Sequence, residues 1–445
     1  MNHRLVGVNP DFSLTSFIVL GIYDIIPTRI LYMSTTQNSN FKWYILVLSF
    51  LSSTFVSAIP TSCMPVLFEE IRKDLGLNLV QVGTIWGATG AAGIFVALIA
   101  GTLGDRFGVS LVLGIASLLV GITGALRGFS NTFFVLAITV LLTGLVKQII
   151  PINITKLTVV WFRDKNLGLA NAVGAMGMGF GLMLGPMISA TVISPWLGGW
   201  RNVMFFYGAL SAIVGGMWFF FAKTPANSTS YTPATRIPFK KVFSTLIRNK
   251  VVWLVGLTIT FRMAGIQGMT GYLPLYLHNL GWTQANAGGA LSLFYAMSTV
   301  SVIPLAAFSD RIGLRKVILL TGLVVTTLSL GLLPIVGPGV VWGLMVISGI
   351  FMDAFMSIIM TTLLESKGIE LSTAGTALGI VFTISPIGSV VAPPIGNSLA
   401  KYNADLPFIF WAGLSVIGII TMLMIKETGW RKRRAVNNQQ PSTTS

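Results

Sequence analysis

The sequence predicts an all-α membrane protein built as two pseudo-symmetric bundles of about six helices each. Three observations support this fold class. The chain of 445 residues is 53% hydrophobic and only 9% charged, whereas a typical soluble domain has about 25% charged residues. Apolar runs long enough to cross a membrane recur from Trp43 onward, and one short motif is repeated at a fixed spacing in the two halves. A soluble fold is therefore excluded.

The apolar runs give the helices in order. A hydrocarbon core of about 30 Å takes about 20 helical residues to cross, and about twelve runs meet that length. We expect membrane helices over residues 43–66, 79–101, 110–127, 132–160, 167–194, 203–222, 251–277, 286–308, 315–336, 340–364, 373–399 and 406–425.

The basic residues between these runs predict the topology. With the amino end inside, 18 Lys and Arg residues fall on the cytoplasmic side after the first helix and five on the other side, namely Arg72, Lys73, Arg127, Arg201 and Lys401. Because basic residues are enriched in cytoplasmic loops, this asymmetry predicts that both termini lie in the cytoplasm. The expected location is the cytoplasmic (inner) membrane.

The same pattern divides the chain into segments. We expect an amino-terminal bundle over 41–222, a polar cytoplasmic linker over 223–250, a carboxyl-terminal bundle over 251–427 and a basic, then polar, tail over 428–445. Residues 1–40 read as an extension, because the apolar run from Phe12 to Ile26 is too short to span. A polar start follows at Met33, so translation from Met33 is one hypothesis and a signal peptide is another.

Composition also limits the chemistry. Cys63 is the only cysteine, which excludes an intrachain disulfide framework. The net charge of +16 follows the topology rather than a nucleic-acid site, and we expect no nucleic-acid partner. The sequence has only two histidines, His3 and His278, and no Gly-rich phosphate loop ending in Lys-Ser or Lys-Thr. We therefore predict no metal, no cofactor, no enzymatic activity and no ATP-driven pumping.

An internal repeat is the strongest signal. After the second predicted helix the motif reads Gly101, Asp105, Arg106 and Gly108, and after the eighth it reads Asp310, Arg311 and Gly313. Corresponding residues lie 205 positions apart, and so do the upstream pairs Leu75-Gly76 and Leu280-Gly281. A constant offset over this distance predicts two structurally equivalent halves, as in many secondary transporters.

At these motifs the sequence resembles the major facilitator superfamily, over about residues 41–430. The resemblance implies a central cavity lined by helices 1, 4, 7 and 10. It also implies that Asp105, Arg106, Asp310 and Arg311 belong to a latch that closes the cytoplasmic side. The alternative is that these charges only hold a turn and satisfy the positive-inside bias. Val109 and Ser110 depart from the basic residues that usually follow the first motif.

A row of small residues marks the fifth helix. Gly177, Gly181 and Gly185 recur every fourth residue, and Pro186 follows. Glycines at this spacing share one helix face and permit close contact with a neighbouring helix. The segment resembles a family element that is often associated with exchangers, but close packing alone explains the pattern, so we do not infer antiport from it.

Candidate substrate residues are the ionisable groups near the midplane, since each costs roughly 2.5–3.5 kcal/mol to place there. They are Lys147, Arg262 and Asp353, and the resemblance puts them on helices 4, 7 and 10. Their net charge of +1 predicts a small organic or inorganic anion, held by Arg262 and Lys147. Asp353 would pair with a base when the site is empty or accept a cotransported proton. Gln148, Gln267 and Tyr272 are further candidates, and an internal ion-pair network is the alternative.

The predicted function is alternating-access secondary transport of a small, anionic solute by a monomer in contact with lipid, coupled to a proton or to an exchanged anion. A multidrug or metabolite exporter of the same fold is the closest alternative. A membrane solute sensor and a polytopic membrane enzyme are the others.

Overall fold

The computed structural model describes residues 41–162, 167–221, 244–366, 368–370 and 373–429. The predicted extension over 1–40, most of the linker over 223–250 and the tail beyond 429 lie outside these residues. Eleven segments of the described chain are helices long and apolar enough to cross a membrane. A further helix of 29 residues, α5 (Leu79–Phe107), occupies the position of the second predicted span.

The first group of helices covers residues 41–221 and includes several interrupted spans. Helix 1 consists of α2 (Phe41–Leu51), the π-helical turn η2 (Ser52–Ala58), α3 (Ile59–Ser62) and α4 (Met64–Leu75). Helices 2 and 3 are α5 and α6 (Val109–Leu126), which ends in the short turn η3 (Arg127–Phe129). Helix 4 is α7 (Phe133–Lys147) plus α8 (Ile149–Phe162), helix 5 is α9 (Leu167–Ile188) with η4 (Ser189–Ile193) and α10 (Ser194–Leu197), and helix 6 is α11 (Trp200–Phe221).

The second group covers residues 250–424 in the same order. Helices 7 to 9 are α13 (Lys250–Asn279), α14 (Gln284–Ile312) and α15 (Arg315–Leu332), which ends in η5 (Leu333–Ile335). Helix 10 is α16 (Pro338–Ile350) plus α17 (Met352–Leu364), helix 11 is α18 (Ala374–Ile384) plus α19 (Pro386–Leu399), and helix 12 is α20 (Leu406–Met424).

The second helix of each group shows the repeat most clearly. Both α5 and α14 have 29 residues, and their first and last residues lie 205 positions apart. Asn78 caps α5 by accepting the Gln81 amide at 2.9 Å, and Thr283 caps α14 by accepting the Asn286 amide at 3.2 Å. These caps satisfy amides that a helix start leaves free. The sequence repeat is thus a repeat of helix boundaries.

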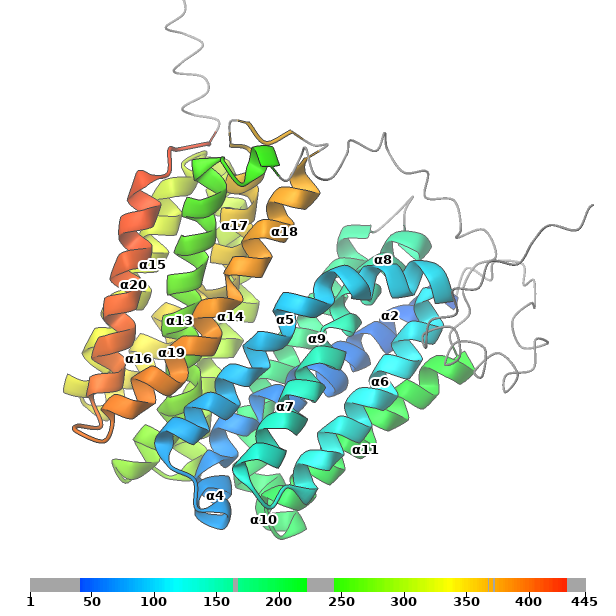
Figure 1. Ribbon diagram of the computed structural model, residues 1–445, viewed down its shortest axis with the longest axis vertical. Coiled ribbons are helices and arrows are strands. Elements are labelled where there is room, and N and C mark those ends of the chain that lie inside the picture. The colour runs from blue at the N-terminus through cyan, green and yellow to red at the C-terminus, as the bar shows by residue number, and fades with distance from the viewer. Residues whose placement is uncertain (1–40, 163–166, 222–243, 367, 371–372, 430–445) are drawn as a thin grey trace, which may run out of the picture.

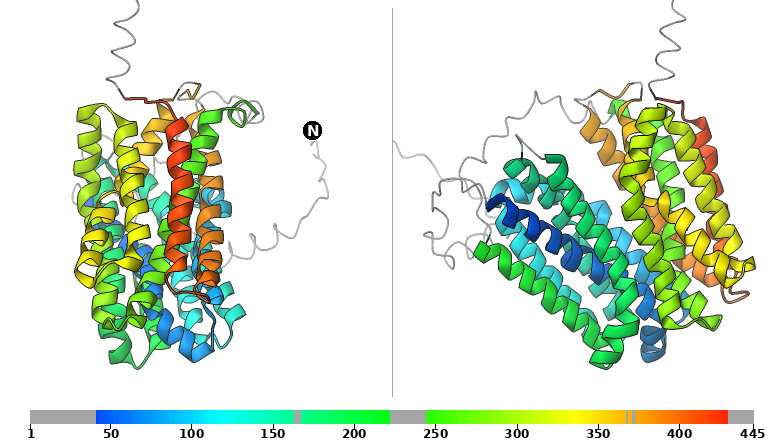
Figure 2. Two further views of the ribbon diagram at one scale, coloured as in Figure 1. Left: turned by 90° about the vertical axis from the view of Figure 1, so that its left-hand side faces the viewer. Right: turned by 180° about the vertical axis from the view of Figure 1, so that it is seen from behind.

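The two groups, which we call the N half and the C half, lie side by side (Figure 1). We call the end at which α2 begins and α20 ends the tail end, and the end with α4 and α10 the loop end. The halves meet where α5 packs on α19 and α9 packs on α14. In two views the N half leans away from the C half toward the tail end (Figures 1 and 2).

Close backbone contact joins the halves toward the loop end. A Cβ atom on Gly83 or Gly87 would lie 2.7 or 2.5 Å from the carbonyl oxygens of Pro393 and Val390, so these helices approach too closely for any side chain. Asn397 also donates a hydrogen bond to the Leu79 carbonyl at 2.9 Å. Trp86 and Thr89 of α5 add further hydrogen bonds to Gln267 of the C half.

The fourth helix of each half is interrupted near its middle. In the N half the interruption follows Lys147, whose carbonyl would pair with the amide that Pro151 lacks. In the C half it lies at Phe351, and a side chain of helix 7 inserts there, as described below. Helix 11 is also interrupted, at Ser385 before Pro386. Irregular backbone therefore lies near the middle of helices 4, 10 and 11.

Candidate functional site: a cavity shared by the two halves

A cavity of about 230 Å³ lies between the halves. Its wall takes three residues from the N half and six from the C half: Thr89, Gly90, Gln148, Ile259, Met263, Met356, Ser385, Pro386 and Ser389. The cavity begins where the close packing ends, because Gly90 faces the Ser389 side chain at this level. Hydroxyl and amide groups share the wall with an isoleucine and two methionines.

The N half brings Lys147 and Gln148 to this level. Gln148 follows α7 and lines the cavity. Lys147, the last residue of α7, donates from Nζ to Thr61 Oγ1 at 2.8 Å, and Thr61 in turn donates to the Ser57 carbonyl at 3.1 Å. Both predicted residues are half-buried, and of the two only Gln148 belongs to the cavity wall.

Arg262 on α13 is completely buried. Its Nη2 donates to the carbonyls of Phe351 and Met352 at 2.9 and 3.0 Å, and its guanidinium lies 4.2 Å from the centre of the Phe355 ring. Arg262 thus adds a charged donor to two carbonyls at the interruption of helix 10, one of which, that of Phe351, also accepts the Phe355 amide, and cation–π attraction adds to this contact. Its Nε and Nη1 have no hydrogen-bond partner, while the next residue, Met263, lines the cavity.

Asp353 lies in the first turn of α17, directly after those two carbonyls. It accepts a hydrogen bond from Ser298 Oγ at 2.6 Å, and its own amide donates to the same oxygen at 3.2 Å. The structure shows no ion pair within 4 Å between Asp353 and Arg262 in the part of the chain that it describes. The expected pairing of Asp353 with a base in the empty site is therefore absent in this conformation.

The other two predicted residues lie elsewhere. Gln267 bridges the halves. Its side-chain Nε2 donates to Thr89 Oγ1 at 3.2 Å, and its backbone carbonyl accepts a hydrogen bond from Trp86 Nε1 at 2.7 Å. Tyr272 is buried among Tyr276, Phe408 and Trp411, and its hydroxyl donates to the Ala404 carbonyl. Gln267 thus adjoins the cavity through Thr89, whereas Tyr272 packs inside the C half.

Sequence reasoning missed the hydroxyl groups of the wall. Ser385 and Ser389 are four residues apart and face the cavity together with Thr89. Their spacing is a signal, since positions i and i+4 share a helix face. It is a weak one, because Ser and Thr are common wherever membrane helices contact each other.

Arg127 was expected in a connection outside the membrane, but it is only 2% exposed. Its Nε donates to the Gly124 carbonyl at 3.1 Å and its Nη1 to the Pro60 carbonyl at 2.7 Å. The end of helix 3 thus lies against helix 1 at the turn that contains Pro60. The sequence analysis counted Arg127 only toward the topology and did not predict that it is buried.

The first copy of the repeated motif ends α5. Gly108 has φ of 87°, a conformation that favours glycine, so α5 can stop and α6 can begin at once. Arg106 is exposed, and its guanidinium lies 5.4 Å from the centre of the Phe107 ring. Gly101 and Asp105 belong to α5, but the surroundings of both lie outside what the structure describes.

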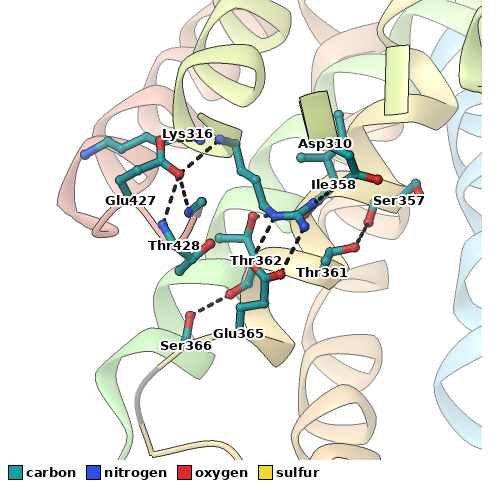
Figure 3. A network of polar contacts seen from close by, with 12 residues as sticks. Asp310, Lys316, Ser357, Ile358, Thr361, Thr362, Glu365, Ser366, Glu427 and Thr428 are labelled. Carbon is teal, nitrogen blue, oxygen red and sulfur yellow. Dashed lines mark hydrogen bonds and ion pairs between the residues drawn. The ribbon is translucent and has the colours of Figure 1, made fainter. Parts of the chain in front are cut away.

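The second copy carries a charged network (Figure 3). Arg315 pairs with Asp310 at 3.0 Å and with Glu365 at 2.9 Å, and so ties helices 8, 9 and 10 together. Glu427 accepts the Arg315 and Lys316 amides at 3.0 Å each. Gly313 ends α14 with φ of 66°, and Arg311 is exposed.

The glycine row of helix 5 faces helix 1. Gly177 and Gly181 accept hydrogen bonds at their carbonyls from Thr54 at 2.8 Å and from Ser62 at 3.3 Å, and Gly185 lies against the Ser62 hydroxyl. Pro186 lies at the other contact of this helix, where its carbonyl faces Gly288 of the C half. These contacts place the fifth helix between helix 1 and helix 8.

Comparison with known proteins gives a family match over most of the chain. The model of the Major Facilitator Superfamily matches residues 50–368 and 279–444. A probable nitrate/nitrite antiporter, NarK1 of Thermus thermophilus, is 26% identical over 57% of this chain and 58% of its own length, less than two thirds of that protein. The nitrite extrusion protein of Bacillus subtilis is 22% identical over 84% of this chain and 92% of its own. The multidrug resistance protein MdtG of Proteus mirabilis is 25% identical over 83% of this chain and 92% of its own length.

Solved structures show the same fold. The nucleoside transporter NupG aligns with a TM-score of 0.71 at 17% identity over 87% of this chain and 99% of that one. A bacterial homolog of the human lysosomal transporter Spinster, in an inward-facing and occupied conformation, aligns with a TM-score of 0.71 at 14% identity. The alignment covers 88% of this chain and 98% of that one. At these identities the likeness concerns the fold alone.

Proposed function

We propose that this chain, which belongs to the Major Facilitator Superfamily, is a secondary transporter that moves a small anion across the membrane by alternating access. One observation carries the proposal: a cavity between the two halves has Gln148 and Met263 in its wall, and each directly follows a cation in the chain, the half-buried Lys147 and the fully buried Arg262. A pocket shared by two halves can open to either side when the halves rock about it.

The charges around the cavity favour an anion. Lys147 and Arg262 outweigh Asp353, so the local formal charge is positive, and the low dielectric of the bundle extends its reach. The Lys147 ammonium has three N–H donors, of which Thr61 takes one. In this conformation Arg262 acts through its field and its hold on helix 10, and Lys147 acts through its field. Gln148 and the hydroxyls of the wall supply direct contacts.

The size of the cavity favours a small solute. Its volume of about 230 Å³ is below the roughly 300–1,000 Å³ of pockets that hold drug-sized ligands. Two relatives are named for nitrate or nitrite, which are anions of a few atoms. We infer that an inorganic oxoanion or a small carboxylate is the substrate.

The contacts between the halves support an alternating mechanism. With the tail end in the cytoplasm, the packing of Gly83 and Gly87 on helix 11 closes the outer side, and this conformation faces inward. In the opposite state these contacts separate, and the two motif loops, with Asp105, Arg106 and Arg311, close the cytoplasmic side. Asp353 is the proposed acceptor of a coupled proton.

A multidrug exporter is the second candidate. Ile259, Met263 and Met356 give the cavity an apolar side, and methionines adapt to varied ligands. MdtG is also matched over nearly its full length. This candidate requires a neutral or cationic substrate, which the positive charge near the cavity disfavours.

Flux measurements in proteoliposomes test the proposal. We expect nitrate, nitrite or a small carboxylate to be taken up, and Gln148→Leu to raise the KM about tenfold, which corresponds to about 1.4 kcal/mol. Thr321→Val is the control, because Thr321 is exposed on α15 and bonds only within its own helix. Uptake of lipophilic cations without uptake of anions would instead establish the exporter.

A further inference from the structure

Arg127 is a buried cation that the proposed transport cycle does not use. Two of its nitrogens donate to backbone carbonyls, of Gly124 and of Pro60. The third, Nη2, is buried and has no hydrogen-bond partner. An unsatisfied donor that carries part of a full positive charge is costly in the interior of a membrane protein. This position is therefore open to a ligand that accepts hydrogen bonds.

A second cation converges on the same turn of helix 1. Lys147 donates to the Thr61 hydroxyl at 2.8 Å, and Thr61 directly follows Pro60, which Arg127 contacts at 2.7 Å. Helices 3 and 4 thus direct a guanidinium and an ammonium toward consecutive residues of α3. Two like charges brought to one turn repel each other unless an opposite charge lies nearby.

The carboxylates of the N half are engaged elsewhere. Those whose side chains the structure describes all lie on α4, where Glu69 pairs with Lys73 at 2.9 Å, Glu70 accepts from Ser194 at 2.6 Å and Asp74 pairs with Arg201 at 2.9 Å. Within the described residues, neither Arg127 nor Lys147 has a carboxylate within 4 Å. The side chains that the structure describes thus supply no carboxylate at this turn.

We propose that a small inorganic anion, of the size of a halide or nitrate, binds between Arg127 Nη2 and Lys147 Nζ beside the Pro60–Thr61 turn. The guanidinium offers a planar pair of donors and the ammonium a point charge, a combination suited to a compact anion. The site lies within the N half and shares no wall residue with the cavity between the halves. It holds its anion whichever solute the central cavity carries.

Thermal unfolding of the purified full-length protein tests this site. The protein is kept in sodium gluconate, whose anion is too large, and is titrated with chloride, bromide or nitrate at constant ionic strength. We expect a saturable rise in Tm of about 2 °C or more, because a ligand that binds only the folded state stabilises it. Arg127→Gln should abolish the rise, and Lys147→Met provides a second variant should Arg127→Gln fail to fold.

Two controls separate this site from the central cavity. Arg201→Gln removes an arginine that is already paired with Asp74, and it should keep the full anion response. Gln148→Leu alters the central wall and should also keep it. The proposal is overturned if the native protein shows no response. It is equally overturned if Gln148→Leu abolishes the response while Arg127→Gln preserves it.

Discussion

The two halves stabilise the interruption of their fourth helix in different ways. In the N half the cation, Lys147, belongs to the interrupted helix itself and is held by the Thr61 hydroxyl of helix 1. In the C half the cation, Arg262, comes from helix 7 and holds the carbonyls of the interruption, while Asp353 is held by Ser298. The same order of helices thus carries two charge arrangements, and of these residues only Asp353 of the C half is a carboxylate.

This difference suggests that the two cations have different roles, one in stability and one in anion binding. Arg262 is fully buried and fixes the backbone of helix 10, whereas Lys147 is half-buried and retains donors for a ligand. We expect substitutions in the C-half arrangement to affect stability most and those in the N-half arrangement to affect anion affinity most.

The largest stability effect should come from Arg262→Met. Two carbonyls at the interruption of helix 10 lose a charged donor, and the free energy of unfolding should fall by about 3 kcal/mol. Reversible unfolding with SDS in mixed micelles measures this loss. Arg311→Met, at an exposed arginine, should change stability little. A loss below about 1 kcal/mol for Arg262→Met would show that the guanidinium does not fix helix 10.

A smaller effect is expected for Ser298→Ala. The carboxylate of Asp353 loses its 2.6 Å donor, and hydrogen bonds to charged groups contribute about 1.5–3 kcal/mol. We expect a loss of about 1.5 kcal/mol in the same unfolding measurement. Double substitution with Asp353→Asn should cost less than the two single losses combined, because the two side chains contact each other. Additive losses would contradict a direct bond.

The smallest stability effect should follow Thr61→Val. The shape of the side chain is kept and only the hydroxyl that holds Lys147 is lost, at a half-buried position, so the loss should be about 1 kcal/mol or less. Anion affinity should nevertheless change, because the ammonium is no longer held in place. Thr123→Val is the matched control, since Thr123 bonds within its own helix. A stability loss larger than that of Ser298→Ala would contradict the proposal that the C-half arrangement contributes more to stability than the N-half arrangement.

Much of the helical plan could be predicted from the sequence because lipid imposes strong length and composition limits. The second span was expected over 79–101 and is the helix Leu79–Phe107, and the repeat of 205 positions recurs in its caps and in the glycines that end α5 and α14. Interruptions at Gln148 and Phe351 were not predicted. The apolar runs continue through both positions, so hydropathy gives no sign that the helix is interrupted there.

The candidate site was predicted only in outline. Lys147 and Arg262 each directly precede a wall residue of the cavity, whereas Asp353 contacts Ser298. All three were singled out because burial of a charge in a membrane demands a partner or a function, a rule that can be applied to sequence alone. The packing of Tyr272 inside the C half and the burial of Arg127 could not be predicted, for a different reason. An aromatic side chain can point to either side of its helix, and an arginine at the end of a predicted span can point to solvent or fold inward.

Composition, span length and the internal repeat determined the class of protein, its helix order and the equivalence of its halves, since these depend on transfer of apolar segments into lipid. Only the tertiary structure decided which donors face the shared cavity, which cation holds helix 10 and that Arg127 is buried beside Pro60. Those contacts join residues far apart in the chain, and they depend on helix rotation and on backbone interruptions that local sequence leaves undetermined.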